Sequence, residues 1–190
     1  MAMSMRKVEV EKAKSITQHF EFIDEFQPAL DDELPPAEYI QILTDNEHYQ
    51  DAVTFLAHAL PAREAVWWAC VCARHHIDNA DEKYQVGLKA AEAWVYDNSE
   101  ENRRVCEKHA ENGEYSTVAS WVCAAVFWSG GSIAAADEPV MEVMPYIYAH
   151  AVAGSIVSAV SFSQPEPEEI TERYKEYIKH GINIANGGNG

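Results

Sequence analysis

Apolar residues along most of the chain recur every three or four positions, which is the period of an α-helix. Residues 49–60 carry Tyr, Val, Leu and Leu in an i, i+4, i+7, i+11 series. Strongly apolar or periodic runs predict further helices over residues 62–77, 115–128, 145–162 and 170–184. The pattern contains no convincing series of strands and no strand–helix–strand unit. We therefore predict an all-α fold, a single-domain helical bundle of about eight helices.

The N-terminal region departs from this helical period. Residues 8–11, VEVE, alternate apolar and acidic side chains and predict at most one short edge strand. Ser15 and Gln18 have the spacing of a capping box, so a helix is predicted from Ser15 until Pro28 ends it. The predicted organisation is an N-terminal extension, a helical domain and a flexible tail, over residues 1–14, 15–185 and 186–190.

The stretch AVWWACVCAR, residues 65–74, places two adjacent tryptophans and a Cys-x-Cys pair in one apolar run. It is either a thiol-bound metal centre or a helix buried on every side. At about 100° per residue, Cys70 and Cys72 point about 200° apart around a helix, so their sulfurs cannot bind one ion together. The unbroken apolar run instead favours a central packing helix, with Trp68 as a core residue.

Charge narrows the range of partners. The chain has 14 basic and 31 acidic residues, a formal net charge of −17, which disfavours binding to nucleic acid or to an anionic membrane surface. Ten acidic residues and no Lys or Arg lie between Ser15 and Ala62. This run is either a solvated acidic face or a docking surface for a basic protein partner. The acidic residues that we assign to the docking surface are Asp31, Asp32, Glu33 and Glu38.

Two tryptophans are candidate anchors for such a partner, because aromatic side chains dominate binding hot spots. They are Trp67, in the apolar run above, and Trp128, at the end of the predicted helix 115–128. Trp128 is followed by Ser-Gly-Gly-Ser at 129–132, which is either a helix stop or a backbone nest for an anion. The helix stop is favoured, because the dipole at a helix C-terminus repels anions.

Histidines offer the remaining candidate chemistry. His75 and His76 precede Asp78, and His76 shares a helix face with Cys72, but two ligands do not make a zinc site. We expect surface histidines here, and neither a metal nor a cofactor. His150, within an apolar run, is either a hydrogen-bonded core histidine or a general base, and the core position is favoured.

The chain is expected to be cytoplasmic. Its N-terminus lacks the apolar segment and cleavage site of a secretory signal, so free thiols are expected at the four cysteines. The apolar runs at 65–73 and 118–128 are shorter than the ~20 residues that a bilayer requires. The longer run at 140–162 contains Glu142, Pro145 and His150, and no basic cluster flanks it.

Four blocks in a fixed order carry a family resemblance: PAREAVWWACVCAR, AAEAWV, SWVCAAVFWSGGS and AHAVAGSIVSAV, at 61–74, 90–95, 120–132 and 149–160. The chain resembles an uncharacterised bacterial family of all-helical proteins, although it is more acidic and less rich in alanine and arginine. Members of that family are commonly encoded near components of type VI secretion systems. The resemblance implies an accessory, adaptor or cargo-handling role, and it implies no catalytic residues.

The leading hypothesis is a non-enzymatic accessory or adaptor protein of a bacterial secretion system that binds a protein partner. The partner is a basic protein, a component of the apparatus or its cargo. One alternative is an immunity protein that neutralises a basic toxin. Another is an enzyme whose pocket between helices gathers His150, His75, His76 or Glu64. No nucleophile elbow, zinc-protease or dinucleotide-binding motif occurs in the sequence.

Overall fold

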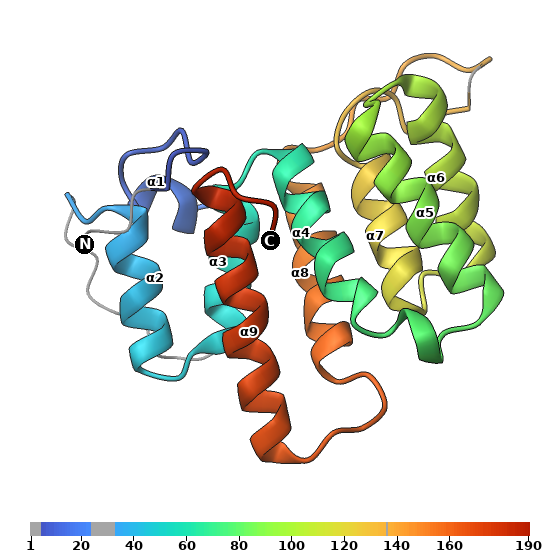
Figure 1. Cartoon of the computed structure of the whole chain (residues 1–190). Coiled ribbons are helices and arrows are strands. Elements are labelled where there is room, and N and C mark those ends of the chain that lie inside the picture. Colours follow the sequence, from blue (N-terminus) through green and yellow to red (C-terminus); the bar gives the residue numbers. More distant parts are fainter. Residues whose placement is uncertain (1–4, 24–32, 136) are drawn as a thin grey trace. The chain divides into compact units, whose positions relative to one another are not determined.

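The computed structural model describes residues 5–23, 33–135 and 137–190. These residues form nine α-helices and one short 3-10 helix (Figure 1). The all-α fold predicted from the hydrophobic period is confirmed. Within it the helices group into two compact units. One unit comprises the chain up to Pro61 together with Val160–Gly190, and the other comprises Ala62–Ala159.

The first unit contains four helices: α1 (Lys14–Thr17), α2 (Pro36–Asp45), α3 (Tyr49–Ala59) and α9 (Pro167–Ala185). Helix α3 packs against the other three. Its Phe55 is fully buried and lies 4.9 Å, between ring centroids, from the buried Tyr39 of α2. A stacked pair, Tyr49 and Tyr174, joins α3 to α9 at 5.9 Å. Aromatic contacts therefore link α3 to both α2 and α9.

The helix predicted between Ser15 and Pro28 is wrong in extent, because α1 ends at Thr17. Its N-cap is Ala13 without a side-chain hydrogen bond, so the predicted capping box does not form. The chain then leaves the helical path so that Phe20 packs on His58 of α3, with ring centroids 5.0 Å apart. Tertiary burial of aromatic rings here outweighs the local helical period. The remainder of the predicted helix lies outside the described residues from 24 onwards.

The short edge strand predicted at residues 8–11 is also wrong, since these residues have no strand conformation. A backbone bond from Lys7 N–H to the Ala185 carbonyl (2.8 Å) ties this segment to the end of α9. Alternation alone does not make a strand when no neighbouring extended segment pairs with it.

The second unit contains α4 (Ala62–Arg74), a 3-10 helix (Ile77–Asn79), α5 (Glu82–Tyr96), α6 (Glu100–Asn112), α7 (Val118–Phe127) and α8 (Ile147–Val160). Helix α7 packs against α4, α5 and α6. It carries buried residues along its whole length, as its continuous apolar sequence predicts. Trp68 of α4 is fully buried, which confirms that AVWWACVCAR is a packing helix.

Side-chain caps fix where several of these helices begin. The 3-10 helix follows α4, and Asp81 is the N-cap of α5. The Asp81 carboxylate accepts the Tyr84 N–H at 2.8 Å. Thr117 and Ser120 form a reciprocal capping box at the start of α7. No helix among the described residues has both the length and the apolar character to span a membrane.

Candidate functional site

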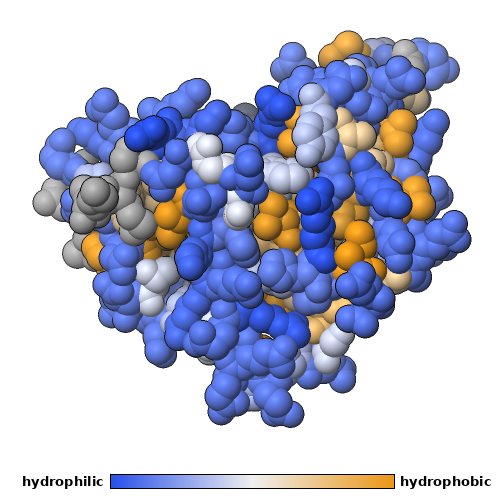
Figure 2. All heavy atoms as spheres, in the orientation of Figure 1, coloured by the Kyte–Doolittle hydropathy of each residue, from blue (hydrophilic) through white to orange (hydrophobic). Residues whose placement is uncertain are grey.

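The connection between α7 and α8 exposes an unusual amount of apolar surface. Figure 2 shows orange, apolar atoms at the top of the view, where the connection is traced in Figure 1. The apolar residues concerned, which we name the hairpin patch, are Ile133, Val140, Met141 and Met144, with exposed fractions of 37%, 76%, 58% and 69%. Large exposed apolar residues that cluster in one segment are typical of interaction sites.

The backbone of this connection is ordered as a short hairpin, residues 132–135 and 137–142, which we name the α7–α8 hairpin. Ser132 and Glu142 form an antiparallel bridge, and the Ile133 N–H donates to the Met141 carbonyl at 2.9 Å. The Ser132 hydroxyl oxygen accepts the N–H groups of Ala134 and Met141, both at 3.1 Å. The hairpin patch is thus held by specific hydrogen bonds.

Two adjacent arginines of α6 anchor the first half of the hairpin. Arg103 donates from Nη1 to the Phe127 carbonyl (2.6 Å) and from Nη2 to the Ser132 carbonyl (2.8 Å). Arg104 donates from Nη2 to the carbonyls of Ser132 and Ala134, both at 2.9 Å. A guanidinium is suited to this task because its several N–H donors are fixed in one plane. The C-terminus of α7 and the start of the hairpin are therefore fastened to α6.

Acidic neighbours balance the charge of these arginines. Glu100 accepts from Arg103 Nε at 2.6 Å and from Arg104 Nε at 2.9 Å, and Glu107 accepts from Arg104 Nη1 at 3.0 Å. The Arg103 hydrogen bond is the main cause that lowers the pKa of Glu100 from 4.5 to about 2. Both guanidinium groups also lie over the Phe127 ring, at 4.8 and 5.5 Å from its centroid.

A cavity of about 560 Å³, the Trp128 cavity, lies at the base of the hairpin. Its walls include Trp128, Met144, Tyr146 and Tyr148. Glu142 is the one charged side chain among the described residues that line it. Burial, with a smaller effect of Tyr146, raises the pKa of Tyr148 to about 12, so its phenol is neutral at pH 7. The cavity thus combines aromatic walls with a single carboxylate.

The Trp128 ring is held in place by two further aromatic residues. Tyr115 stacks on it with 5.9 Å between centroids and a 5° angle between planes. Trp121, two turns earlier on the same face of α7, meets it edge-on at 6.3 Å. All three residues are half-buried. This packing fixes the orientation of the ring that faces the cavity.

The other residues assigned to partner binding are dispersed. Trp67 is half-buried, with the Arg74 guanidinium 5.1 Å from its ring centroid. Glu33 is exposed and forms an ion pair with Lys12 at 2.6 Å, and Glu38 is exposed in the first turn of α2. The remaining two, Asp31 and Asp32, lie outside the described residues. Only Trp128 of the assigned set lines the Trp128 cavity among the residues that the structure describes.

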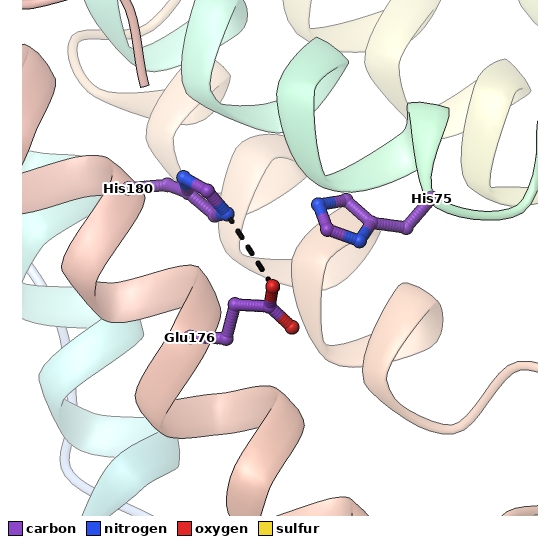
Figure 3. Close-up of side chains that lie close together, drawn as sticks. All are labelled: His75, Glu176 and His180. Carbon is purple, nitrogen blue, oxygen red and sulfur yellow. Dashed lines mark ion pairs between the residues drawn. The ribbon is translucent and has the colours of Figure 1, made fainter.

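The histidine predictions are partly wrong. His75 is exposed as expected, whereas His76 is buried because the chain turns back into the 3-10 helix that follows α4. His150 is exposed on α8 and is not the core residue predicted from its apolar neighbours, because it lies on the side of α8 opposite Val152. Figure 3 shows the side chains of Glu176 and His180 one turn apart on α9, with Glu176 Oε1 3.9 Å from His180 Nε2.

The four cysteines are buried with free thiols. Burial is the largest cause that raises the pKa of Cys70, and a hydrogen bond with Cys106 together with burial raises that of Cys123. The Cys123 S–H donates to the Gly87 carbonyl at 3.2 Å. Metal binding and nucleophilic attack both need the thiolate, which these surroundings disfavour. Cys70 and Cys123 therefore serve to pack the second unit.

The sequence interpretation missed the hairpin. The segment PVMEVM at 139–144 lies close to the bridge at Ser132, but it gives no alternating strand signal, because Val140 and Met141, and also Val143 and Met144, are adjacent apolar residues. In the sequence, residues 140–144 instead continue into the apolar run at 140–162. The anchoring role of Arg103 and Arg104 has no local signal, since their partners lie more than twenty residues away along the chain.

Comparison with known proteins assigns the chain to one protein family. No curated protein and no solved structure matches it. A family model matches residues 39–185, which include most of both units and the whole of the candidate site. The chain belongs to this family of unknown function, DUF6931.

Proposed function

We propose that the chain is a non-enzymatic, partner-binding protein of the bacterial cytoplasm, an accessory or adaptor of a type VI secretion system. The observation that carries the binding function is the α7–α8 hairpin, which is fixed by hydrogen bonds while the hairpin patch, on it and directly after it, exposes four large apolar side chains. The link to secretion rests on the resemblance of the ordered sequence blocks.

The anchoring of the hairpin favours a binding surface over an irregular loop that has no binding role. A side chain on a flexible loop loses conformational entropy when a partner fixes it, which weakens binding. Here Arg103 and Arg104 already fix the backbone below the hairpin patch through four hydrogen bonds to carbonyl groups. A pre-organised apolar patch beside a cavity is the arrangement of a docking site for a protein.

Charge supports a basic partner. The sequence contains no Lys or Arg between Lys108 and Arg173, a span that holds the whole hairpin, and it contains Asp137, Glu138 and Glu142. The acidic residues assigned earlier in the chain, Asp31, Asp32, Glu33 and Glu38, add to this field and would speed the encounter with a positive partner. Complementary charge governs the association rate more than the final affinity.

The second candidate function is an immunity protein, which the net charge of −17 supports equally well. Its partner is a basic toxin, and binding abolishes the activity of that toxin. The two functions share the hairpin patch and differ in the identity of the partner.

Affinity purification with matched variants tests the proposal. A tagged chain replaces the native copy in the cells that encode it, and co-purified proteins are quantified for wild type and for Met141→Ser/Met144→Ser. The control is Val86→Ser/Val105→Ser, which removes exposed apolar residues from α5 and α6. We expect recovery of one partner to fall roughly tenfold or more in the hairpin variant and to persist in the control.

Equal recovery from wild type and the hairpin variant contradicts binding through this surface. A secretion component or its cargo as the partner supports the adaptor. A basic toxin that the chain inhibits supports the immunity protein.

A further inference from the structure

We propose that the Trp128 cavity receives an arginine or lysine side chain of the protein partner, while the hairpin patch contacts apolar residues on either side of it. This inference rests on the proposed partner-binding function and specifies the chemistry of that partner. It assigns the cavity to a basic residue within an apolar segment.

The carboxylate of Glu142 supplies the charge complementarity. It is the one charged side chain among the described residues lining the cavity, and Glu142 is itself part of the hairpin bridge to Ser132. Its backbone position is thus fixed before a partner arrives. Hydrogen bonds from a cationic donor to a carboxylate are shorter and stronger than neutral ones. A guanidinium or ammonium group therefore fits the cavity, whereas a carboxylate or phosphate is repelled.

The aromatic walls favour the same ligand. Trp128, Tyr146 and Tyr148 line the cavity, and the faces of such rings attract a cation within about 6 Å of the ring centroid. The ring of Trp128 is already held by Tyr115 and Trp121, so it need not be ordered on binding. The long aliphatic part of an Arg or Lys side chain packs against apolar walls such as Met144 while its head reaches the carboxylate.

The two arginines that anchor the hairpin do not oppose this assignment. Arg103 and Arg104 reach the Ser132 carbonyl, but each is paired with Glu100, and Arg104 is also paired with Glu107. Two positive and two negative groups therefore balance beside the cavity. The cavity volume, about 560 Å³, lies within the ~300–1,000 Å³ of ordinary ligand pockets.

Peptide binding to the full chain tests this inference. The probe is a synthetic peptide with arginine flanked by leucine and valine, and the matched peptide carries citrulline, a neutral isostere of arginine. Both are titrated calorimetrically into wild type, into Glu142→Gln and into Glu138→Gln. Glu138 is an exposed acidic residue of the same hairpin that does not line the cavity.

We expect citrulline to weaken binding to wild type by about three- to tenfold, and Glu142→Gln to weaken binding of the arginine peptide by the same factor. In the Glu142→Gln variant the two peptides should bind equally, because the interacting pair is already broken. Glu138→Gln should retain the preference for arginine.

Equal binding of both peptides to wild type overturns the cationic assignment, as does failure of the arginine peptide to bind at millimolar concentration. Neither result removes the proposed function by itself. A peptide affinity that does not discriminate charge but is lost in Met141→Ser/Met144→Ser leaves the hairpin patch as the docking site.

Discussion

The guanidinium of Arg103 lies directly against the backbone of Gly131. A Cβ atom at Gly131 would come within 3.1 Å of Cζ, Nε and Nη2 of Arg103, and this glycine has φ +71°, a conformation that other residues rarely adopt. The arginine that anchors the α7–α8 hairpin thus needs a glycine at the turn after α7. The Ser-Gly-Gly-Ser segment is a helix stop, as predicted, and it also leaves room for the anchor.

Gly131→Ala should therefore lower the free energy of unfolding by about 1–3 kcal/mol, since it combines an unfavourable φ with displacement of a buried arginine. Gly130→Ala is the matched control, because nothing lies within 4 Å of its Cβ position and its φ is not positive. We expect the control to be neutral or more stable by up to about 1 kcal/mol. Urea denaturation of both variants measures the difference, and equal stabilities would show that Arg103 does not pack as described.

Acid should weaken the ion pairs that Glu100 forms with Arg103 and Arg104. The pKa of Glu100 is about 2 in the folded chain against an ordinary 4.5, so its ion pairs stabilise the fold above pH 4.5. That contribution is lost as pH falls from 4.5 towards 2, because the carboxylate takes up a proton. The stability difference between wild type and Glu100→Gln should therefore shrink between pH 6 and pH 3. Solvent screening keeps it modest, since the Glu100 side chain is 60% exposed. A difference that does not change with pH contradicts this assignment.

The two adjacent tryptophans of α4 should differ in their effect on stability. Trp68 is fully buried, so Trp68→Ala should cost about 3–5 kcal/mol of unfolding free energy. Trp67 is half-buried, and Trp67→Ala should cost clearly less. Chemical denaturation of both variants tests this order. Normal stability of Trp68→Ala together with lost partner binding would reassign Trp68 from the core to the interface.

Removing charge from the assigned acidic docking residues should slow association without loosening the fold. Neutralising Asp31, Asp32 and Glu33 together is expected to leave the melting temperature nearly unchanged and to lower the association rate with the partner at low salt. The effect should fade as salt is raised, because exposed charges are then screened. Stopped-flow mixing at two ionic strengths measures it. An unaltered association rate at low salt removes these residues from the docking surface.

Much of the fold could be predicted from the sequence, because buried helices leave a strong local pattern. The runs that became α4, α7 and α8 are continuous in apolar residues, and their bounds were predicted to within a few residues. The first helix was predicted too long, because the pull of Phe20 towards His58 acts between segments distant along the chain. Hydrophobic periodicity depends only on residues that are close in the sequence, so it does not account for such contacts.

The candidate site was less accessible to prediction. Trp128 was predicted as an anchor for a partner, because an aromatic at the end of an apolar helix is visible in sequence; the structure places it in the wall of the Trp128 cavity, and its binding role stays a prediction. The position of Glu142 beside Trp128 was not predicted, because Glu142 reaches the cavity through a hairpin bridge to Ser132. The exposure of Met141 and Met144 was not predictable either, because an apolar segment of this composition is equally typical of a buried core.

The most direct test of partner binding is site-specific photo-crosslinking in the cells that encode the chain. A photoreactive amino acid replaces Met144 in the hairpin patch or, as control, Val105 on α6, which is also apolar and exposed. We expect one partner adduct from position 144 and none from position 105. A partner that co-purifies with the chain yet crosslinks from position 105 and not from 144 would contradict it.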